Sequence, residues 1–322
     1  MHPPANPLLA IVGPTAAGKT RLAVALGQRF GGEIINADSR QVYQHMDVGT
    51  AKPTSLERSR APHHLLDIAQ PDDPFSLGTF LALARELIPE IRQRGHLPIL
   101  AGGTGQYVWA LLEGWQVPVV PPDPEFRAGK LREAEAQGGD TLHAELRAID
   151  PQRAAELDPR NLRRVIRALE IHRFTSSPGF TGNPPSTLAQ DRGEPVTALI
   201  LGLTMERASL YQRIDDRVDQ MMEQGFLEEV EKLAGMGYRI GQGPLASPGY
   251  RELGQHLEGE LSLEEAVQRT KYQTHRLARR QYTWFKPADP RIRWLNAQDP
   301  NVDEQAAQLV EDYLRSAPPV IQ

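Results

Sequence analysis

A glycine-containing segment near the start of the chain has the residue types needed to hold phosphate groups. It reads GPTAAGKT and consists of Gly13, Pro14, Thr15, Ala16, Ala17, Gly18, Lys19 and Thr20. The apolar run Leu8–Val12 precedes it as a predicted strand, and Thr20–Phe30 follows as a predicted helix. In this context glycines let backbone N–H groups face phosphate oxygens, Lys19 adds a positive charge and the Thr20 hydroxyl can bind Mg²⁺. The segment therefore predicts a phosphate-binding P-loop that works with magnesium.

The P-loop alone does not identify the reaction. A kinase or NTPase usually places an acidic Mg²⁺ ligand at the end of a second apolar strand. Asp38 follows the predicted strand Glu33–Ala37 and fits that position. On these residues alone, a P-loop kinase or NTPase acting on a small molecule is the leading hypothesis. A noncatalytic RNA-binding protein with a P-loop that no longer works is a further alternative.

The elements that must position this loop alternate between strands and helices over the first 115 residues. A third strand is predicted at LPILAGG, and a helix at Phe80–Arg94 that Pro89 should kink or divide. Alternating strands and helices indicate a parallel sheet with helices on its faces. We therefore predict an α/β fold with a P-loop NTPase-like core.

The composition of the chain changes after Trp115. The proline-rich QVPVVPPDPEF is typical of a boundary, residues 125–174 look wholly helical, and TSSPGFTGNPPSTLAQDRGEP is typical of a mobile loop. Strand character returns at Val196–Met205, and from Glu206 the chain looks helical, ending in Leu263–Phe285. We predict a core in two parts, residues 1–119 and 196–322, interrupted by an all-α insertion at 120–195.

Composition excludes several classes of protein. The 322 residues contain no cysteine, so disulfides and cysteine-ligated zinc are impossible. No run approaches 18 apolar residues and the N-terminus does not resemble a signal peptide, so we expect a cytoplasmic protein without membrane contact. His63-His64 is not expected to bind metal, because adjacent histidines seldom face one ion. The net charge of -5 argues against binding of nucleic acid by the whole surface, although local basic patches remain open.

Seven ordered blocks of sequence resemble the tRNA dimethylallyltransferases, also called isopentenyl-tRNA transferases. The blocks are ADSRQVYQHMDVGTAKP, PHHLLDI, RGHLPILAGGTGQY, NLRRVIRALEI, LYQRIDDRVDQMMEQGFLEEV, GYREL and RRQYTWF. This resemblance implies transfer of a dimethylallyl group from dimethylallyl diphosphate to the exocyclic amine of an adenine beside the tRNA anticodon. It points to the bacterial type, because the zinc-finger extension of eukaryotic members needs cysteines. The P-loop would then hold a leaving diphosphate.

The same resemblance implies roles for individual residues. Asp38 would be the base that takes the proton from the amine, Thr104 would place a hydroxyl near the reacting centre, and Arg217 would bind the diphosphate. Further residues would contact the anticodon stem-loop of the tRNA: Asp38 and Thr104 themselves, Ser39, Arg40 and Gln41, with Arg127 in the insertion. One active site needs one chain, so we expect a monomer.

Two basic segments predict where RNA binds. RNLRRVIRALEIHRF contains Arg163, Arg164 and Arg167, and RTKYQTHRLARRQYTWFK contains Arg276, Arg279, Arg280 and Gln281 among aromatic residues. Such segments match phosphates and stack on unpaired bases, although a charged run is often only a solvated helix face. Trp284 and Phe285 are expected to belong to the core.

Two blocks depart from the family pattern. ASPGYRE stands where the family usually has Gly-Tyr-Lys-Glu after an apolar residue, and Thr274-His275 stands where it usually has Thr-Arg. Both blocks are expected to touch tRNA, so they would alter affinity or sequence preference.

Overall fold

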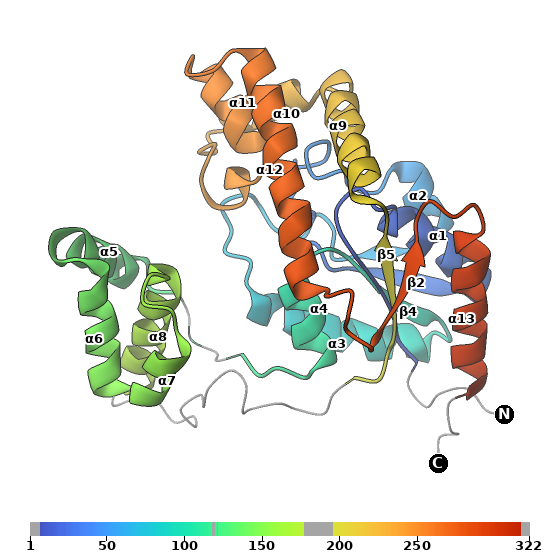
Figure 1. Cartoon of the computed structure of the whole chain (residues 1–322), viewed down its shortest axis with the longest axis horizontal. Coiled ribbons are helices and arrows are strands. Elements are labelled where there is room, and N and C mark those ends of the chain that lie inside the picture. Colours follow the sequence, from blue (N-terminus) through green and yellow to red (C-terminus); the bar gives the residue numbers. More distant parts are fainter. Residues whose placement is uncertain (1–6, 118–119, 121, 177–195, 317–322) are drawn as a thin grey trace. The chain divides into compact units, whose positions relative to one another are not determined.

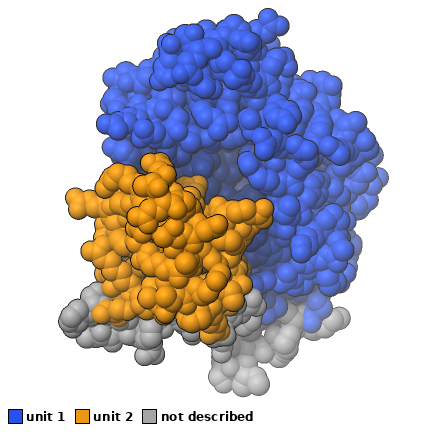
Figure 2. All heavy atoms as spheres, turned by 60° about the vertical axis from the view of Figure 1, so that its left-hand side comes forward, with its two compact units in different colours: residues 1–114, 195–322 blue, residues 115–194 orange. Residues whose placement is uncertain are grey.

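The computed structural model describes residues 7–117, 120, 122–176 and 196–316. The chain divides into two compact units, one made of residues 1–114 and 195–322 and the other of residues 115–194 (Figure 2). The predicted insertion was 120–195, and the unit that the structure separates begins at Trp115. The predicted mobile loop falls almost wholly on residues 177–195, outside the described residues.

A six-stranded parallel sheet forms the centre of the larger unit (Figure 1). Its strands are β1 (Leu9–Val12), β2 (Gly32–Asn36), β3 (His63–His64), β4 (Leu97–Ala101), β5 (Leu199–Thr204) and β6 (Ile292–Asn296), in the order β3-β2-β4-β1-β5-β6. Leu9 of β1 pairs with Ile99 of β4 on one side and Leu199 of β5 on the other. All four residues of β1 are buried, as expected for a parallel strand covered on both faces. The predicted α/β fold with a parallel sheet is confirmed.

Helices cover both faces of this sheet. On one face α1 (Lys19–Phe30) packs against β2, β4 and α13 (Val302–Ser316). On the other face α3 (Leu77–Gln93) packs against β2, β4 and α4 (Gly105–Leu112). Pro89 was expected to kink or divide this helix, and it does not divide it, because α3 continues on both sides of Pro89.

A helical layer follows β5 and extends from the sheet. It contains α9 (Arg207–Glu223), α10 (Phe226–Gly235), the short 3-10 turn Gly243–Ala246, α11 (Tyr250–Leu257) and α12 (Leu263–Trp284). Between β2 and β3, the short α2 (Ser55–Arg60) begins at a capping box of Thr54 and Glu57. An ion pair of Asp219 with Lys271 at 2.7 Å joins α9 to α12, and the His275 Nε2 atom lies 2.8 Å from the Asp215 Oδ1 atom.

Helices are the only regular elements longer than a single bridge among the described residues of the smaller unit. Its helices are α5 (Pro124–Gln137), α6 (Gly139–Ile149), α7 (Pro151–Glu156) and α8 (Leu162–Thr175), around a core that includes Leu142, Leu146, Val165 and Leu169. Proline is favoured at the first helical position because its missing N–H is not needed there. Pro124 and Pro151 take that position behind the capping side chains of Asp123 and Asp150. Most of residues 125–174, which were expected to be wholly helical, lie in these four helices.

The sequence reading missed the C-terminal strand. Residues after Glu206 were expected to be helical, but β6 lies among them and forms one edge strand of the sheet. Only Ile292 and Leu295 of β6 are buried, while Arg293 and Asn296 are exposed. This pattern lacks the apolar run by which the buried strands were found. No helix within the described ranges is both long and apolar enough to cross a membrane.

Candidate active site

The P-loop turns tightly between β1 and α1. Gly13 has φ 136°, and a Cβ there would lie 2.4 Å from the carbonyl oxygen of Leu203. Gly18 has φ 92° and caps α1, so Lys19 is the first residue of the helix. The Lys19 Nζ atom donates to the Pro14 carbonyl at 2.7 Å, which folds the side chain back over the loop. The loop thus places one ammonium over its own backbone, at the N-terminus of α1.

Asp38 lies directly after β2 and is oriented by its neighbours. Its backbone N–H donates to the Asn36 Oδ1 atom at 3.1 Å, and the Asn36 Nδ2 atom donates to its carbonyl at 3.2 Å. The Asp38 Oδ1 atom accepts from the Arg40 N–H at 2.9 Å. No other hydrogen bond to the Asp38 carboxylate is found among the described residues, so Oδ2 is available to a ligand. Asn36 was not predicted, although an asparagine two residues before a site aspartate is typical of such local turns.

The GGTG segment after β4 comes into contact with the Asp38 segment. A Cβ at Gly102 would lie 2.2 Å from the Ala37 carbonyl oxygen, so only glycine fits there. The Thr104 N–H donates to the same carbonyl at 3.2 Å, and its Oγ1 atom accepts from the Ser39 N–H at 3.0 Å. Because the oxygen is used as an acceptor, the hydroxyl proton of Thr104 can be donated to a ligand.

Gln281 joins α12 to both glycine-containing turns. Its Oε1 atom accepts from the Thr15 N–H at 2.7 Å, and its Nε2 atom donates to the Gly103 carbonyl at 3.1 Å. Gln281 is 7% exposed. Resemblance implied that it binds tRNA, but its amide already has two protein partners, so this placement favours a positioning role.

Cations dominate the electrostatics around the P-loop. The pKa of Lys19 is lowered to about 8. Burial is the main cause of this shift, Asp38 opposes it and Arg217 adds to it. Burial also lowers the pKa of Arg217, again opposed by Asp38 and reinforced by Arg213. The Arg213 guanidinium reaches within 4.0 Å of a Cβ position at Gly18. Three cations therefore surround this loop with Asp38 as their main neighbouring anion, and they favour a polyanionic ligand.

Two cavities meet at Asp38 and Arg217. The P-loop cavity has a volume of about 440 Å³ and is lined by Gly18, Lys19, Thr20, Asp38, Arg213 and Arg217, among others. The second cavity, also about 440 Å³, is lined by a polar group and an apolar group of side chains. The polar group contains Asp38, Thr104, Arg217, Arg280 and Gln281, and the apolar group contains Val218, Met221, Phe226, Leu277 and Trp284. Thr15, Ala16 and Thr50 also border both cavities. One cavity is thus suited to phosphates and the other to an organic group beside a carboxylate.

The basic face of α12 contributes to the second cavity. Arg276, Arg279 and Arg280 are exposed, and Arg280 lines this cavity. Phe285 is fully buried, as predicted, whereas Trp284 is 37% exposed and was wrongly assigned to the core. The Trp284 side chain is held against Gly105, where an added Cβ would meet it at 2.3 Å.

The arginines of the helical unit divide into two groups. Arg127 makes a two-point ion pair with the buried Glu170, with both distances 2.8 Å, and Arg167 pairs with the same carboxylate. Arg163 and Arg164 are exposed on α8. Arg127 and Arg167 therefore help to hold α5 and α8 together, whereas Arg163 and Arg164 are accessible to a ligand.

The two departures from the family pattern lie in different parts of the structure. His275 stacks on Tyr211, with ring centroids 4.1 Å apart, and pairs with Asp215, so it joins α9 to α12. Ser247 and Pro248 line the second cavity. Ser247 and Pro248 thus border the candidate site, as does Thr274, whereas His275 is not among the lining residues.

Comparison with known families identifies the chain over most of its length. The IPP transferase family model matches residues 41–288, and an isopentenyl transferase model matches residues 6–66. A tRNA dimethylallyltransferase of Roseiflexus sp. (strain RS-1) is 46% identical over 96% of this chain and 99% of its own length. The tRNA dimethylallyltransferase of Thermomicrobium roseum is 47% identical, covering 96% of this chain and 92% of the relative.

Solved structures agree with these matches. The tRNA isopentenylpyrophosphate transferase of Bacillus halodurans has a TM-score of 0.69 and 40% identity, covering 96% of this chain and 97% of that one. A eukaryotic dimethylallyltransferase, solved acting on tRNA, has a TM-score of 0.81 and 28% identity, covering 99% of this chain and 81% of that one. Sequence, fold and site together show that this chain belongs to the IPP transferase family of prenyl-transferring enzymes.

Proposed function

We propose that this enzyme transfers a dimethylallyl group from dimethylallyl diphosphate to the exocyclic amine of the adenine next to the anticodon of tRNA. The observation that supports this most is the junction of the two cavities. A cationic cavity for a diphosphate and a second cavity for a base share Asp38 and Arg217. A reaction that joins an allylic diphosphate to an amine needs this arrangement, because the carbon must leave one site as it bonds to the other.

The departure of diphosphate is the costly part of this reaction. The allylic C–O bond breaks and its electron pair stays on the diphosphate, which gains negative charge in the transition state. The Lys19 ammonium, the Arg217 and Arg213 guanidiniums and the P-loop N–H groups would stabilise that charge without reorganising. In this mechanism no phosphoryl group is transferred.

The acceptor amine would be handled by Asp38 and Thr104. An adenine amine is a weak nucleophile, because its lone pair is delocalised into the ring. As the C–N bond forms, the nitrogen loses a proton, and the free Oδ2 atom of Asp38 can accept it. The Thr104 hydroxyl, fixed by the Ser39 N–H, would orient the base or the diphosphate by donating a hydrogen bond.

The P-loop residues fit a magnesium ion that binds together with the diphosphate. No cluster of three or more metal-binding side chains is found in the part of the chain that the structure describes. Mg²⁺ is often held by one or two protein oxygens plus substrate phosphates, so the Thr20 hydroxyl beside this cavity suffices in type. When bound, the ion would add positive charge next to the leaving group.

The anticodon stem-loop would contact the exposed cations of both units. Arg276, Arg279 and Arg280 on α12 and Arg163 and Arg164 on α8 are available for phosphates. The target base must leave its stack to reach the second cavity. Because Lys19, Asp38, Thr104 and Arg217 all come from one unit of one chain, we propose that a monomer is active.

Nucleoside mass spectrometry tests this function directly. The purified protein is incubated with dimethylallyl diphosphate, Mg²⁺ and unmodified tRNA, without nucleoside triphosphate. We expect prenylated adenosine and one free diphosphate per product. Product that forms only with ATP, or phosphate release without tRNA, would favour a kinase or NTPase instead.

Replacement of the proposed base should slow the chemical step. We expect Asp38→Ala to reduce turnover by about 10²–10⁴-fold, while the Kd for tRNA stays near that of the wild type. Asp216→Ala, which removes another carboxylate from the P-loop cavity, is the control. Single-turnover rates and filter binding separate the two effects, and nearly normal turnover would exclude Asp38 as the base.

Binding of the diphosphate should weaken in alkaline solution. Lys19 has a pKa of about 8 in the free protein, and a bound diphosphate would raise it. Affinity should therefore be constant below pH 8 and fall about tenfold per pH unit above it, down to the affinity of the neutral-lysine form. The measurement is a titration with an unreactive dimethylallyl diphosphate analogue between pH 6.5 and 10. Lys19→Arg, which stays charged, should bind without this dependence, and equal slopes for both proteins would refute the assignment.

The basic face of α12 should contribute to the salt dependence of RNA binding. We expect Arg279→Ala combined with Arg280→Ala to weaken tRNA binding and to reduce the slope of log K against log salt by about 1–2. The control is Arg315→Ala, an exposed arginine on α13 that pairs with Glu311. An unchanged slope would show that this face does not meet phosphates.

A further inference from the structure

The loop that follows β2 is strained and must be held from outside. It runs from Asp38 to Ala51 and carries Ser39, Arg40 and Gln41 at its start. His45 and Ala51 have φ values of 64° and 47°, in the left-handed region that non-glycine residues seldom adopt. Such a conformation persists only where surrounding contacts impose it. Lys52 and Glu229 provide these contacts.

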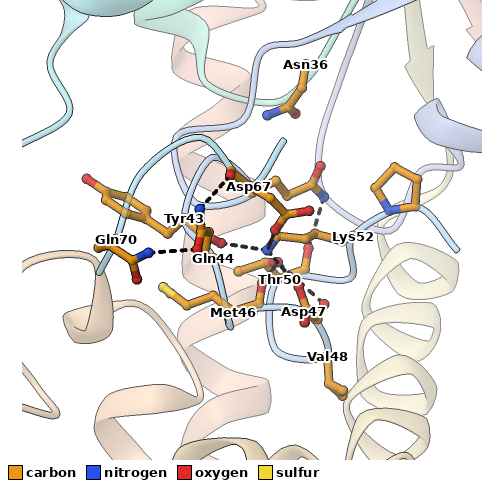
Figure 3. Close-up of polar contacts among 12 residues, drawn as sticks. Asn36, Tyr43, Gln44, Met46, Asp47, Val48, Thr50, Lys52, Asp67 and Gln70 are labelled. Carbon is orange, nitrogen blue, oxygen red and sulfur yellow. Dashed lines mark hydrogen bonds and ion pairs between the residues drawn. The ribbon is translucent and has the colours of Figure 1, made fainter. Parts of the chain in front are cut away.

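Lys52 holds the base of this loop from inside. Its side chain is 2% exposed, and its Nζ atom contacts the Tyr43 carbonyl at 2.6 Å and the Asp47 carboxylate at 2.7 Å. A third contact, of 2.5 Å, goes to Asp67, as Figure 3 shows. Although burial acts to raise it, the bonds from Lys52 and Arg58 lower the pKa of Asp67 below its usual value. Lys52 thus ties three points of the loop region to one buried charge.

Glu229 of α10 holds the far end of the loop. Its Oε2 atom accepts from the Asp47 and Val48 N–H groups at 2.8 and 2.7 Å, and its Oε1 atom accepts from the Gly49 N–H at 3.1 Å. The Tyr250 hydroxyl donates to Oε1 at 2.6 Å. Burial, followed by the charge of Glu229, raises the pKa of Tyr250, so this hydroxyl remains a donor. One carboxylate therefore receives three consecutive backbone donors.

The backbone at Gly49 is also closely packed. A Cβ at Gly49 would lie 2.1 Å from the Phe226 ring and 2.7 Å from the Tyr250 ring. Gly49 and Phe226 both line the second cavity. The anchor is thus next to the site without being one of its ligands.

A link runs from the anchor to the residues proposed to meet tRNA. The Gln41 Nε2 atom donates to the carbonyls of Thr50 and Ala51, both at 3.1 Å, so the two limbs of the loop are tied together. The Asp38 backbone is held separately by Asn36 of β2, through its N–H and its carbonyl, while its Oδ1 atom accepts from the Arg40 N–H inside the loop. A loss of the anchor should therefore displace Ser39–Gln41 more than it displaces Asp38.

We propose that Glu229 is a positioning residue that fixes the Asp38–Ala51 loop in the conformation that receives tRNA, with Lys52 as its internal partner. This role rests on the proposed function, because it assigns the loop to the acceptor. It predicts an effect on tRNA binding and little effect on diphosphate binding or on the chemical step.

The test compares Glu229→Gln with Glu228→Gln, the same change at the exposed neighbouring position on α10. An amide keeps the shape but cannot accept at its nitrogen, so at least one loop N–H loses its partner. For Glu229→Gln we expect the amides of Asp47–Gly49 to exchange hydrogen about tenfold faster or more, and the KM and Kd for tRNA to rise about tenfold. The kcat and the Kd of an unreactive dimethylallyl diphosphate analogue should change by less than about threefold. Glu228→Gln should match the wild type.

Tyr250→Phe supplies a second variant. It removes one donor from Glu229 and leaves the three loop donors in place, so tRNA affinity should stay within about threefold of the wild type. Normal exchange at Asp47–Gly49 in Glu229→Gln would overturn the proposal. So would an equal loss of tRNA affinity, diphosphate affinity and thermal stability, because that pattern indicates general destabilisation. If the wild type transferred no prenyl group, the proposed function would fail, while exchange and tRNA binding would still decide the role of Glu229.

Discussion

The site depends on cations that are buried before any ligand binds. Removing Lys19 and Arg217 from water lowers the pKa of both, and Asp38 offsets this only in part. A charge kept in such surroundings is costly unless it is paired. The fold of the larger unit offsets this cost, because the P-loop, α9 and the segment after β2 are each fixed by contacts of their own. A diphosphate that enters this cavity meets charges already in place, and this pre-organisation makes electrostatic stabilisation effective.

Three turns form the site: the P-loop after β1, the Asp38 segment after β2 and the GGTG segment after β4. Close contacts with these turns fix their positions. Gly13 packs on the Leu203 carbonyl, Gly102 packs on the Ala37 carbonyl, and Gln281 ties Thr15 to Gly103. All three turns follow the carboxyl ends of parallel strands, where open α/β sheets generally bind ligands. The sheet supplies the common edge, and the glycines allow the backbones to approach. A small displacement of one turn would therefore move the others, so Gln281 would influence the reaction through the positions of the turns that it joins.

Local sequence predicted the parts of this fold that local physics decides. The P-loop, the buried strands β1, β2 and β4 and the proline-started helices of the smaller unit all leave short-range signals. Resemblance, and not spacing, pointed to Asp38, Thr104 and Arg217 as a set. What escaped prediction depends on partners that lie far away in the sequence. β6 is a strand because β5 pairs with it. The ion pair of Arg127 with Glu170, 43 residues later, left no signal in the local sequence, and the proposed tRNA contact of Arg127 came from resemblance alone. Glu229 looked like one acid among several in FLEEV, because its function depends on backbone N–H groups about 180 residues earlier.

The position of Asp38 also bears on why a P-loop would serve prenyl transfer. In phosphoryl transfer the acid at the end of the second strand is usually occupied by the metal. Here Asp38 borders both cavities, and its Oδ1 atom is held by the Arg40 N–H, so its Oδ2 atom would be the one to accept the proton. Lys19 and Arg217, two cations of the P-loop cavity, both interact electrostatically with this carboxylate. The same charges that would stabilise a departing diphosphate therefore also act on the proposed base, so the two halves of the reaction depend on one electrostatic arrangement.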